Sequence, residues 1–281
     1  MNFFRADLHC HSTCSDGTLT PRELLLHAKE RNLNALSITD HDTVAAYPQV
    51  FEIAKSLDLL MIPGVEFSAV QDGVSVHILG YCFQIDHPAI TALCQRHSER
   101  RRSRNLAILA LLNKSGIRIT EEEILAQAGT EEHKTIGRPH IAMAMMKRSY
   151  VATVAEAFRK YIGEGRPCFT RGDDVSVEET LNVIHAAGGL AVIAHPHLVE
   201  KNSVVRKLVT MPFDGMECYY GNMGMKFHDK WLRLAKEKEF MVTGGSDFHG
   251  SIKPAIPLGC SWTPEETFRL LLSHYESCKN K

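Results

Sequence analysis

The chain has 281 residues with a formal net charge of −1, of which 44% are apolar and 23% charged, a composition typical of a globular protein and unlike that of a disordered chain. No stretch reaches the roughly 18–20 apolar residues of a membrane span, and the balanced charge gives no overall preference for nucleic acid or membrane. The N-terminus lacks the apolar segment of a signal peptide, so we expect a cytoplasmic protein whose eight cysteines are reduced.

The first third of the chain alternates strand-like and helix-like segments. Apolar runs predict strands at residues 3–9, 34–39, 59–67 and 73–83. Between them we expect helices over residues 20–31 and 46–57. Thr20 is placed to cap the first helix and Pro21 to occupy its first turn.

The middle of the chain, residues 99–166, shows helical apolar stripes and no convincing strand. This segment carries a formal charge of +5, whereas the remainder carries −6. We therefore predict a basic helical insert that covers an acidic site as a lid. Its run of arginines at residues 100–104 is expected to form a solvated helix face, with steering of polyanions as the alternative.

The last third returns to alternation. Helices are expected at residues 177–187, 204–209, 226–238 and 264–274, and strands at 190–194, 215–219 and 240–243. Such alternation is typical of a parallel sheet covered by helices. Polar residues follow at least six of the strands, which favours a closed or nearly closed barrel with its active site at the carboxyl ends of the strands.

His9 and His11 are separated by one residue at the end of the first predicted strand. Residues i and i+2 of a strand point to the same side, so both imidazoles can reach one point. Further runs of the same kind follow other apolar segments. They contribute Asp40, His41, Glu66, His77, His195, Asp247 and His249. Imidazoles mixed with carboxylates suit Mn, Fe or Zn better than Mg or Ca, so the sequence predicts a transition-metal site.

These motifs resemble the PHP (polymerase and histidinol phosphatase) family of metal-dependent phosphoesterases. The runs that carry the resemblance are DLHCHS, SDG, TDHDT, GVEFS, VHILGY, AHP and SDFHG, all within residues 7–250. GRPHIA at 137–142 and FRKYIGEGRPCF at 158–169 are similar to the branch that contains nucleoside 3′,5′-bisphosphate phosphatases and exonucleases that trim RNA 5′ ends. The resemblance implies a distorted (β/α)7 barrel formed by residues 1–98 and 167–281, with residues 99–166 as a small inserted helical domain.

The resemblance also implies three divalent metal ions, with Mn as the first choice and Fe or Zn as alternatives. One ion would be held by His9, His11, Glu66 and Asp247. A second would be held by Glu66 as a bridge, His77 and His195, and a third by Asp16, His41 and His249. Metals about 3.5–4 Å apart can share a hydroxide that attacks phosphorus in line.

Other residues are candidates for supporting roles. Asp40 is expected to orient a ligand imidazole, and His197 is the candidate for the general acid. Glu217 has two interpretations: it supports the ligand side chains, as Asp40 is expected to do, or it is a structural acid. For substrate phosphate we favour Arg138 and His140, and then Arg171.

The expected activity is hydrolysis of a phosphomonoester of a small nucleotide, first a nucleoside 3′,5′-bisphosphate, to the nucleoside monophosphate and phosphate. A 5′→3′ exonuclease on short RNA or DNA and a histidinol-phosphate phosphatase are the alternatives. A non-catalytic metal-binding module is disfavoured because structural metal sites are usually closed and rich in cysteine. The sequence gives little sign of an extended base-stacking platform, so no long nucleic acid is expected as substrate. It does not indicate the oligomeric state.

Overall fold

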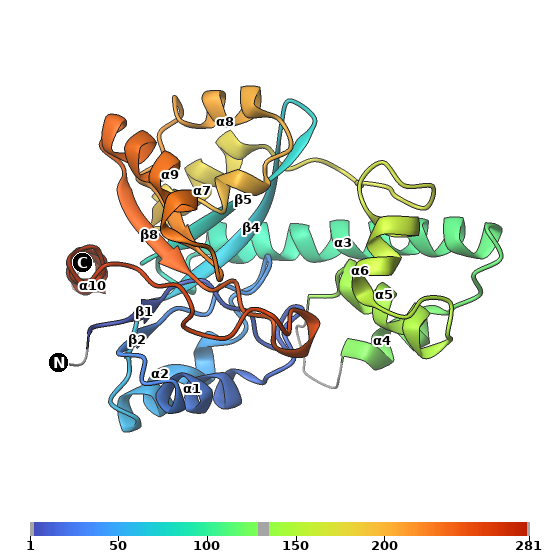
Figure 1. Cartoon of the computed structure of the whole chain (residues 1–281), viewed down its shortest axis with the longest axis horizontal. Coiled ribbons are helices and arrows are strands. Elements are labelled where there is room, and N and C mark those ends of the chain that lie inside the picture. The colour runs from blue at the N-terminus through green and yellow to red at the C-terminus, as the bar shows by residue number, and fades with distance from the viewer. Residues whose placement is uncertain (1–2, 129–134, 280–281) are drawn as a thin grey trace.

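The computed structural model describes residues 3–128 and 135–279. It consists of a body built around two β-sheets and a helical lobe that projects from one side of that body (Figure 1). The strands are β1 (Ala6–Asp7), β2 (Ala35–Leu36), β3 (Leu60–Met61), β4 (Gly64–Gln71), β5 (Val74–Tyr81), β6 (Leu190–Ile193), β7 (Gly215–Tyr220) and β8 (Met241–Gly245).

A sheet of three parallel strands, in the order β1-β2-β3, lies against two helices. These are α1 (Pro21–Glu30) and α2 (Tyr47–Ser56). Helix α1 begins as predicted: the Thr20 side chain accepts a hydrogen bond from the Glu23 backbone, and Glu23 reciprocates in a capping box. The strand predicted over residues 59–67 is divided into β3 and β4. Pro63 lies in the break, and its ring nitrogen has no hydrogen to donate to a neighbouring strand.

The second sheet has five strands in the order β4-β5-β6-β7-β8. Its outer face is covered by α7 (Val177–Ala186), α8 (Asn202–Leu208) and α9 (Met225–Glu237), as Figure 1 shows. Short 3-10 turns η2 (Pro196–Leu198) and η3 (Gly250–Ile252) follow β6 and β8, and the last helix is α10 (Glu265–Lys279). The sequence prediction of alternating strands and helices is therefore correct for this part of the chain.

The prediction of an entirely parallel sheet is wrong for β5, which runs antiparallel to both β4 and β6. The cause is the short turn between β4 and β5. Asp72 and Gly73 have φ angles of 50° and 72°, as a tight two-residue hairpin turn requires. Parallel neighbours would need a crossover of a dozen or more residues.

The two sheets meet at two places through isolated bridges. Cys10 pairs with Phe248 beyond the ends of β1 and β8, and His41 pairs with Glu66 between the β2 end and β4. The result is a mixed α/β fold whose strand ends converge on one rim, without a single continuous ladder around the described strands. A buried apolar cluster that includes Leu8, Tyr81 and Phe268 fills the interior below that rim.

The helical lobe has its own apolar core, which includes Ile108, Ile141 and Ile162. Its helices are α3 (Pro88–Lys114), α4 (Glu121–Ala128), α5 (Arg138–Lys147), α6 (Val154–Ala157) and the π-helical turn η1 (Phe158–Ile162). Helix α3 is continuous from the body into the lobe (Figure 1), so position 99 lies inside a helix. None of the helices in the described ranges is both long and apolar enough to cross a membrane.

Candidate metal centre and substrate pocket

The nine residues singled out as metal ligands come together at the rim where the strands end. His9 and His11 follow β1, His41 follows β2, His195 follows β6, and Asp247 follows β8. Glu66 and His77 lie within β4 and β5, Asp16 lies in the loop after β1, and His249 lies two residues beyond Asp247. Their convergence follows from the topology, because the parallel strands β1, β2, β6 and β8 direct their carboxyl ends to this rim. The hairpin strands β4 and β5 bring Glu66 and His77 to it from within the strands.

At this rim two strands approach each other closely, and two of the candidate ligands have unusual backbone angles. A Cβ on Gly245 would lie 2.4 Å from the Cβ of His9, so only glycine lets β8 approach β1 this closely. His195 and Asp247 have positive φ angles of 23° and 56°. Non-glycine residues adopt this region at an energetic cost, and such residues cluster at functional sites.

One group of four buried residues has its ligand atoms within 4.8 Å of one another: His9, His11, Glu66 and Asp247. Nε2 of His9 lies 3.4 Å from Oε2 of Glu66, and Nε2 of His11 lies 3.2 Å from the same oxygen. Oδ1 of Asp247 is 3.3 Å from Nε2 of His11. This set is the one that the family resemblance implies for a single ion.

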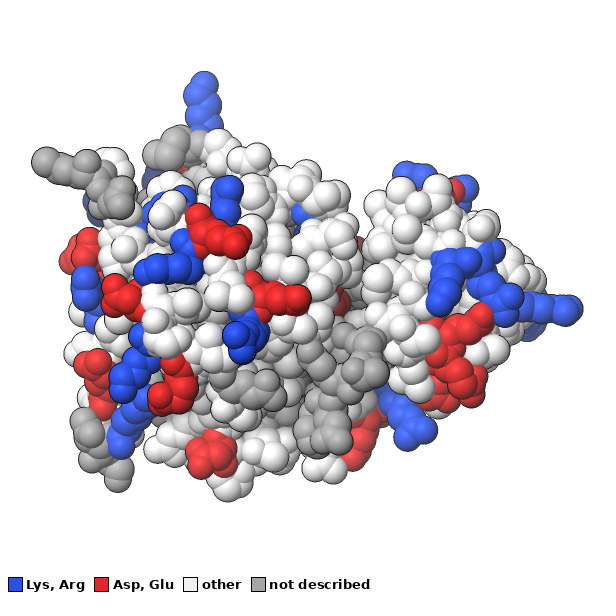
Figure 2. Space-filling view, turned by 90° about the horizontal axis from the view of Figure 1, so that it is seen from below, with Lys and Arg blue, Asp and Glu red and all other residues white. Residues whose placement is uncertain are grey.

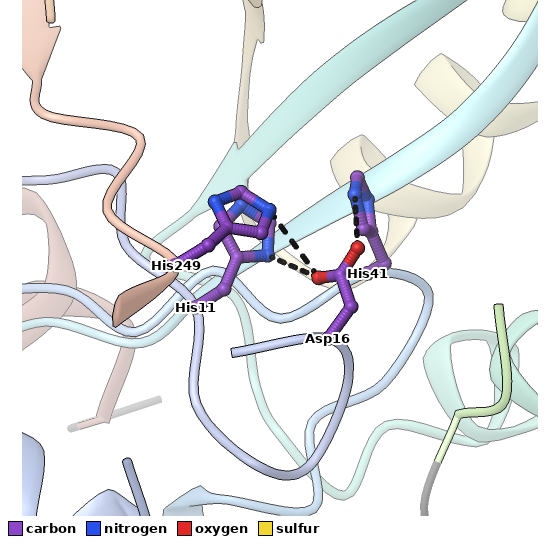
Figure 3. A group of neighbouring side chains, drawn as sticks. All are labelled: His11, Asp16, His41 and His249. Atoms are coloured by element: carbon purple, nitrogen blue, oxygen red, sulfur yellow. Dashed lines mark ion pairs between the residues drawn. The ribbon is translucent and has the colours of Figure 1, made fainter. Parts of the chain in front are cut away.

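A second group consists of His11, Asp16, His41 and His249, with the Asp16 carboxylate between the three rings (Figure 3). The oxygens of Asp16 lie 3.6 Å from Nδ1 of His11, 3.7 Å from Nε2 of His41 and 3.3 Å from Nε2 of His249. The group contains the three residues predicted for another ion and adds His11, which both groups share.

Glu66 also connects the remaining ligands. Its Oε1 lies 2.8 Å from Nδ1 of His77 and 2.8 Å from Nε2 of His195. Its Oε2 lies 3.0 Å from Nδ1 of His41. Burial raises the pKa of Glu66, but the nearby imidazoles of His77, His41 and His9 outweigh burial and hold it well below its usual range. A buried, ionised carboxylate among imidazoles is an arrangement that suits a bridging metal ligand.

The unused hydrogen-bonding capacity fits divalent cations. Among the described residues, several buried site atoms have no hydrogen-bond partner: Nε2 of His9, Nε2 of His11, Nδ1 of His41 and Oε2 of Glu66. Such buried atoms are costly unless something pairs with them. All four belong to the predicted ligands, so the donor set is suited to divalent metal ions.

Neighbouring groups orient the candidate ligands. Glu217 lies 2.8 Å from Nδ1 of His9 through Oε1, and its Oε2 accepts a hydrogen bond from the His195 backbone at 2.8 Å. Nδ1 of His249 is 2.9 Å from the Asp247 carbonyl. In both rings the contact occupies Nδ1 and leaves Nε2 directed at the other candidate ligands. Of the two interpretations of Glu217, the geometry favours the supporting one.

Within the described residues, Asp40 is hydrogen-bonded to two serines and not to an imidazole. Its carboxylate accepts hydrogen bonds from the backbone and hydroxyl of Ser12, at 2.8 and 2.6 Å, and from the hydroxyl of Ser15 at 2.6 Å. Ser15 in turn lies 3.5 Å from Nδ1 of His11. Asp40 therefore holds the loop that carries His11 and Asp16 in place, and it does not orient an imidazole ring by direct contact.

Asp42 was missed by sequence reasoning, although it follows His41 directly. It is buried, with a φ angle of 57°. Its Oδ2 accepts a hydrogen bond from Nε of Arg101 at 2.6 Å, and Oδ1 accepts one from the Ser68 backbone at 2.7 Å. Asp42 thereby links helix α3 of the lobe to the loop that carries a candidate metal ligand.

A cavity of about 390 Å³ opens between the metal centre and the helical lobe. Its volume lies within the range of small-molecule sites. The body contributes Asp16, His41, His77, His249 and Lys253 to its lining. The opposite side contributes five arginines: Arg100, Arg101, Arg104, Arg138 and Arg171.

The arginine run of α3 is not the solvated face that was predicted. Arg100, Arg101 and Arg104 are only 7–8% exposed, and one edge of the helix turns them into the cavity. Of this run, Arg102 remains at the surface, where its side chain is 76% exposed and pairs with Glu121. On the face of the molecule seen in Figure 2, basic and acidic side chains are interspersed over both the body and the lobe. The prediction failed because α3 bridges the body and the lobe, so the side of the helix that carries these arginines is covered by other parts of the chain around the cavity.

Several nitrogens of these arginines lack partners. Within the described residues, Nη1 of Arg100, Nε of Arg104 and Nε of Arg171 are buried without a hydrogen-bond partner. Burial, followed by the charges of Arg101, Arg138 and Arg100, holds the pKa of Arg104 well below its usual range. A guanidinium in this environment favours an anionic ligand, because an anion would both pair with its nitrogens and offset the repulsion.

The remaining predicted residues differ in placement. Arg138 and Arg171 line the cavity, whereas His140 is buried in the lobe, where its Nδ1 accepts a hydrogen bond from the Gly137 backbone at 3.1 Å. His197 packs against Tyr220 and Phe227 and is not among the described residues that line the cavity. Burial, with the neighbouring His195, lowers the pKa of His197 to about 4. A neutral imidazole outside the cavity does not suit the role of general acid.

Comparison with known proteins places this geometry in a family. A family model described as "PHP domain" matches residues 7–171. A "5'-3' exoribonuclease" of Haemophilus influenzae is 36% identical, over 86% of this chain and 89% of the relative. A "3',5'-nucleoside bisphosphate phosphatase" of Chromobacterium violaceum is 29% identical, over 86% of each. A "Phosphoribosyl 1,2-cyclic phosphate 1,2-diphosphodiesterase" of Eggerthella lenta is 32% identical, over 87% of this chain and 94% of the relative.

Solved structures agree with the sequence relatives. A structure from Bifidobacterium adolescentis, assigned as a metal-dependent phosphoesterase, superposes with a TM-score of 0.88 at 30% identity and covers 95% of both chains. An amidohydrolase from Chromobacterium violaceum with bound sulfate superposes with a TM-score of 0.87 at 27% identity and covers 96% of both chains. The chain therefore belongs to the PHP family of metal-dependent phosphoesterases.

Proposed function

We propose that this protein hydrolyses a phosphate ester on the 3′ side of a nucleotide that also carries a 5′-phosphate. The first candidate substrate is a nucleoside 3′,5′-bisphosphate, and the products are a nucleoside monophosphate and inorganic phosphate. The scissile 3′-phosphate would lie at the metal centre and the 5′-phosphate against the arginines.

The observation that carries the proposal is the presence of two separate anion-attracting groups in one cavity. The metal-ligand residues line one side, and the partly unpaired arginines line the other. A substrate with a single phosphate would satisfy only one of them. This argues against histidinol phosphate, which carries one phosphate and no second anion.

For the metal centre we propose three divalent ions, with Mn as the first choice and Fe or Zn as alternatives. His9, His11, Glu66 and Asp247 would hold one ion, and Glu66, His77 and His195 a second. Asp16, His41 and His249, with His11 adjacent, would hold the third. When bound, such ions supply Lewis-acid stabilisation of the charge that develops on the phosphoryl oxygens.

The chain's own residues would bind and orient the substrate for in-line attack by water. Lys253 lines the cavity beside the metal centre, and its Nζ lies 2.6 Å from Oδ2 of Asp247. It adds a positive charge on the side where the scissile phosphate would bind. Arg104, Arg138 and Arg171 would hold the second phosphate, which fixes the distance between the two ends of the substrate.

We propose further that the body, residues 1–98 and 167–281, is a distorted (β/α)7 barrel and that residues 99–166 act as a basic lid over it. The support is the apolar core of the lobe, which is distinct from those of the body. The charge of +5 in this segment is what remains after pairs within it, such as Arg148 with Glu123, have cancelled. Four arginines of the segment line the cavity: Arg100, Arg101, Arg104 and Arg138.

The second candidate is a 5′→3′ exonuclease on short RNA, favoured by the 36% identity to the Haemophilus influenzae relative. The two candidates share their binding mode. In both, a 5′-phosphate would contact the arginines, and the 3′ ester would be cleaved. In both, the P–O3′ bond breaks and O3′ leaves on the first nucleotide, so they differ in whether the phosphate that accepts the water also carries a further nucleotide through its 5′ oxygen.

The test is an assay of the Mn-loaded protein on adenosine 3′,5′-bisphosphate, adenosine 3′-monophosphate and 5′-phosphorylated RNAs of two to ten nucleotides. We expect hydrolysis of the bisphosphate, and a KM for the 3′-monophosphate that is higher by about tenfold or more, because two charge-assisted hydrogen bonds to the 5′-phosphate are lost. Equal KM values for these two would overturn the two-phosphate proposal. A kcat/KM that rises with RNA length and falls steeply with salt would favour the exonuclease.

A further inference from the structure

We propose that the cavity contains a separate subsite for the nucleobase, formed by an apolar wall of the helical lobe, and that this subsite accepts any base. The inference rests on the proposed function, since it concerns the same cavity and a nucleotide substrate. It adds a part of the site that neither the metal centre nor the arginines provide.

The wall consists of Pro139, Val154, Ala155 and Phe158, all of which line the cavity. Pro139 comes from the first turn of α5, and the other three come from α6 and the start of η1. These side chains lie on the arginine side of the cavity, away from the strands that carry the metal-ligand residues. Phosphates gain little from apolar side chains, whereas a base buries its flat face well against them.

Phe158 is held in position by its neighbours. It packs against the apolar core of the lobe, and the Arg138 guanidinium lies 5.4 Å from its ring centroid and 5.3 Å from that of Phe169. Phe158 also begins the π-helical turn η1. Short π-helical turns are rare and occur frequently at functional sites. The ring and the cation of the phosphate site thus form one rigid unit, which sets the base beside the 5′-phosphate.

The chemistry of the wall predicts its selectivity. None of its four side chains carries a hydrogen-bond donor or acceptor. Glu164, a polar residue of the lobe that also lines the cavity, is paired with Arg171, so the wall itself has no means of reading the edge of a base. Binding would depend on buried apolar area and stacking, which every base offers. We therefore expect a modest preference for purines over pyrimidines and a clear preference for a nucleotide over a sugar phosphate that lacks a base.

The test compares three matched substrates of the Mn-loaded protein: 2′-deoxyadenosine 3′,5′-bisphosphate, its cytidine counterpart, and the abasic analogue 1,2-dideoxyribose 3,5-bisphosphate. Each is assayed with the wild type, with Phe158→Leu and with Tyr161→Leu. Tyr161 is a matched control, because it packs against the same core and lies in the same turn but is not among the described residues that line the cavity.

We expect the wild type to prefer the adenine substrate over the abasic one by about tenfold in kcat/KM, as the loss of one base stack implies. Adenine and cytosine should differ by less than about fivefold, since only stacked area distinguishes them. Phe158→Leu should reduce the preference for a base severalfold by raising KM for the two nucleotides while leaving the abasic rate unchanged. Tyr161→Leu should retain the preference.

The failures are distinguishable. If the wild type hydrolyses none of the three, the proposed function fails. If it hydrolyses all three equally well, the base subsite fails and the proposed function stands. If Phe158→Leu lowered kcat/KM equally for the nucleotide and abasic substrates, the assignment of Phe158 to the base subsite would be overturned. If the wild-type kcat/KM values for the adenine and cytosine substrates differed by a hundredfold or more, base tolerance would be overturned.

Discussion

The metal centre and the arginine wall lie on opposite sides of one cavity but are built on different principles. Residues at or near the strand ends form the metal centre. Imidazoles offset the cost of burying the Glu66 carboxylate, and Lys253, followed by His249 and His9, does so for Asp247. One helix face supplies most of the arginine wall. There Asp42 pairs with Arg101, while Arg104 has like charges as its main neighbours.

This difference indicates what each side is missing. The metal centre has an excess of lone pairs that point at one another, which cations would satisfy. The wall gathers five arginine charges around the cavity, and three of these side chains have a buried N–H without a hydrogen-bond partner among the described residues. An anion would offset this charge. A substrate with two phosphates, combined with bound metal ions, would meet both needs at once.

The largest expected effect is at the centre of the metal side. Glu66→Gln removes the charge that contacts five imidazoles, so we expect kcat/KM to fall by about a thousandfold or more, equivalent to about 4 kcal/mol of barrier. The protein should also retain less manganese after dialysis, measured by metal analysis. Glu179→Gln is the control, because Glu179 lies at the surface in a pair with Arg96. Full manganese content with full activity in Glu66→Gln would contradict a bridging role.

The next effect should be confined to the arginine wall. Arg104→Met retains the buried apolar stem and removes the cation, so KM for adenosine 3′,5′-bisphosphate should rise by about tenfold to a hundredfold, the value of one or two charge-assisted hydrogen bonds. KM for adenosine 3′-monophosphate should stay unchanged, because that substrate has no 5′-phosphate. In the absence of phosphate, the variant should melt a few degrees higher than wild type, since repulsion among buried arginines is relieved.

Arg102→Met is the matched control for Arg104→Met. Both residues lie on α3, but the Arg102 side chain is 76% exposed, so neither KM should change. If Arg104→Met weakened both substrates equally, the arginine would serve the fold of the lobe and not the second phosphate. If Arg102→Met had the larger effect, the surface charge of the lobe would matter more than the cavity.

The same contrast explains how much the sequence could predict. The metal side was predictable because side chains two residues apart on a strand point to the same face. In addition, His9, His11 and Glu66 occur in short motifs that follow apolar runs. The arginine side was not, because burial of Arg100 and Arg104 depends on where the lobe lies relative to the body. A helical period alone does not distinguish a face toward solvent from a face toward a polar cavity.

Of the other differences between prediction and structure, one has a local cause and the rest have long-range causes. The antiparallel β5 could have been predicted from the Asp72-Gly73 turn, whose sequence is a strong hairpin signal. The roles of Asp42 and Glu217 depend on contacts between residues far apart in the chain, such as Glu217 with His9. Such pairs have no short-range signal in a single sequence.

The smallest of the expected effects tests whether the metal side depends on its supporting residues. Glu217→Gln retains an oxygen that can accept the hydrogen bond from the His195 backbone, but it removes the charge beside Nδ1 of His9. Carboxylates in this position raise the basicity of a metal-binding imidazole, and their loss typically weakens metal binding by about tenfold or more. We expect a loss of about tenfold in manganese affinity, measured by calorimetry on the metal-free protein.

Asp214→Asn provides the matched control for this last prediction. Asp214 makes the same pair of contacts as Glu217, with Nε2 of His185 at 2.9 Å and the Ala191 backbone at 2.7 Å, but none of these residues belongs to the groups that could hold a metal. Its replacement should lower the melting temperature and leave manganese affinity unchanged. If Glu217→Gln, like Asp214→Asn, lowered the melting temperature without changing manganese affinity, Glu217 would be a structural acid. The geometry of the metal side would then depend on backbone packing, such as the close approach of Gly245 to His9.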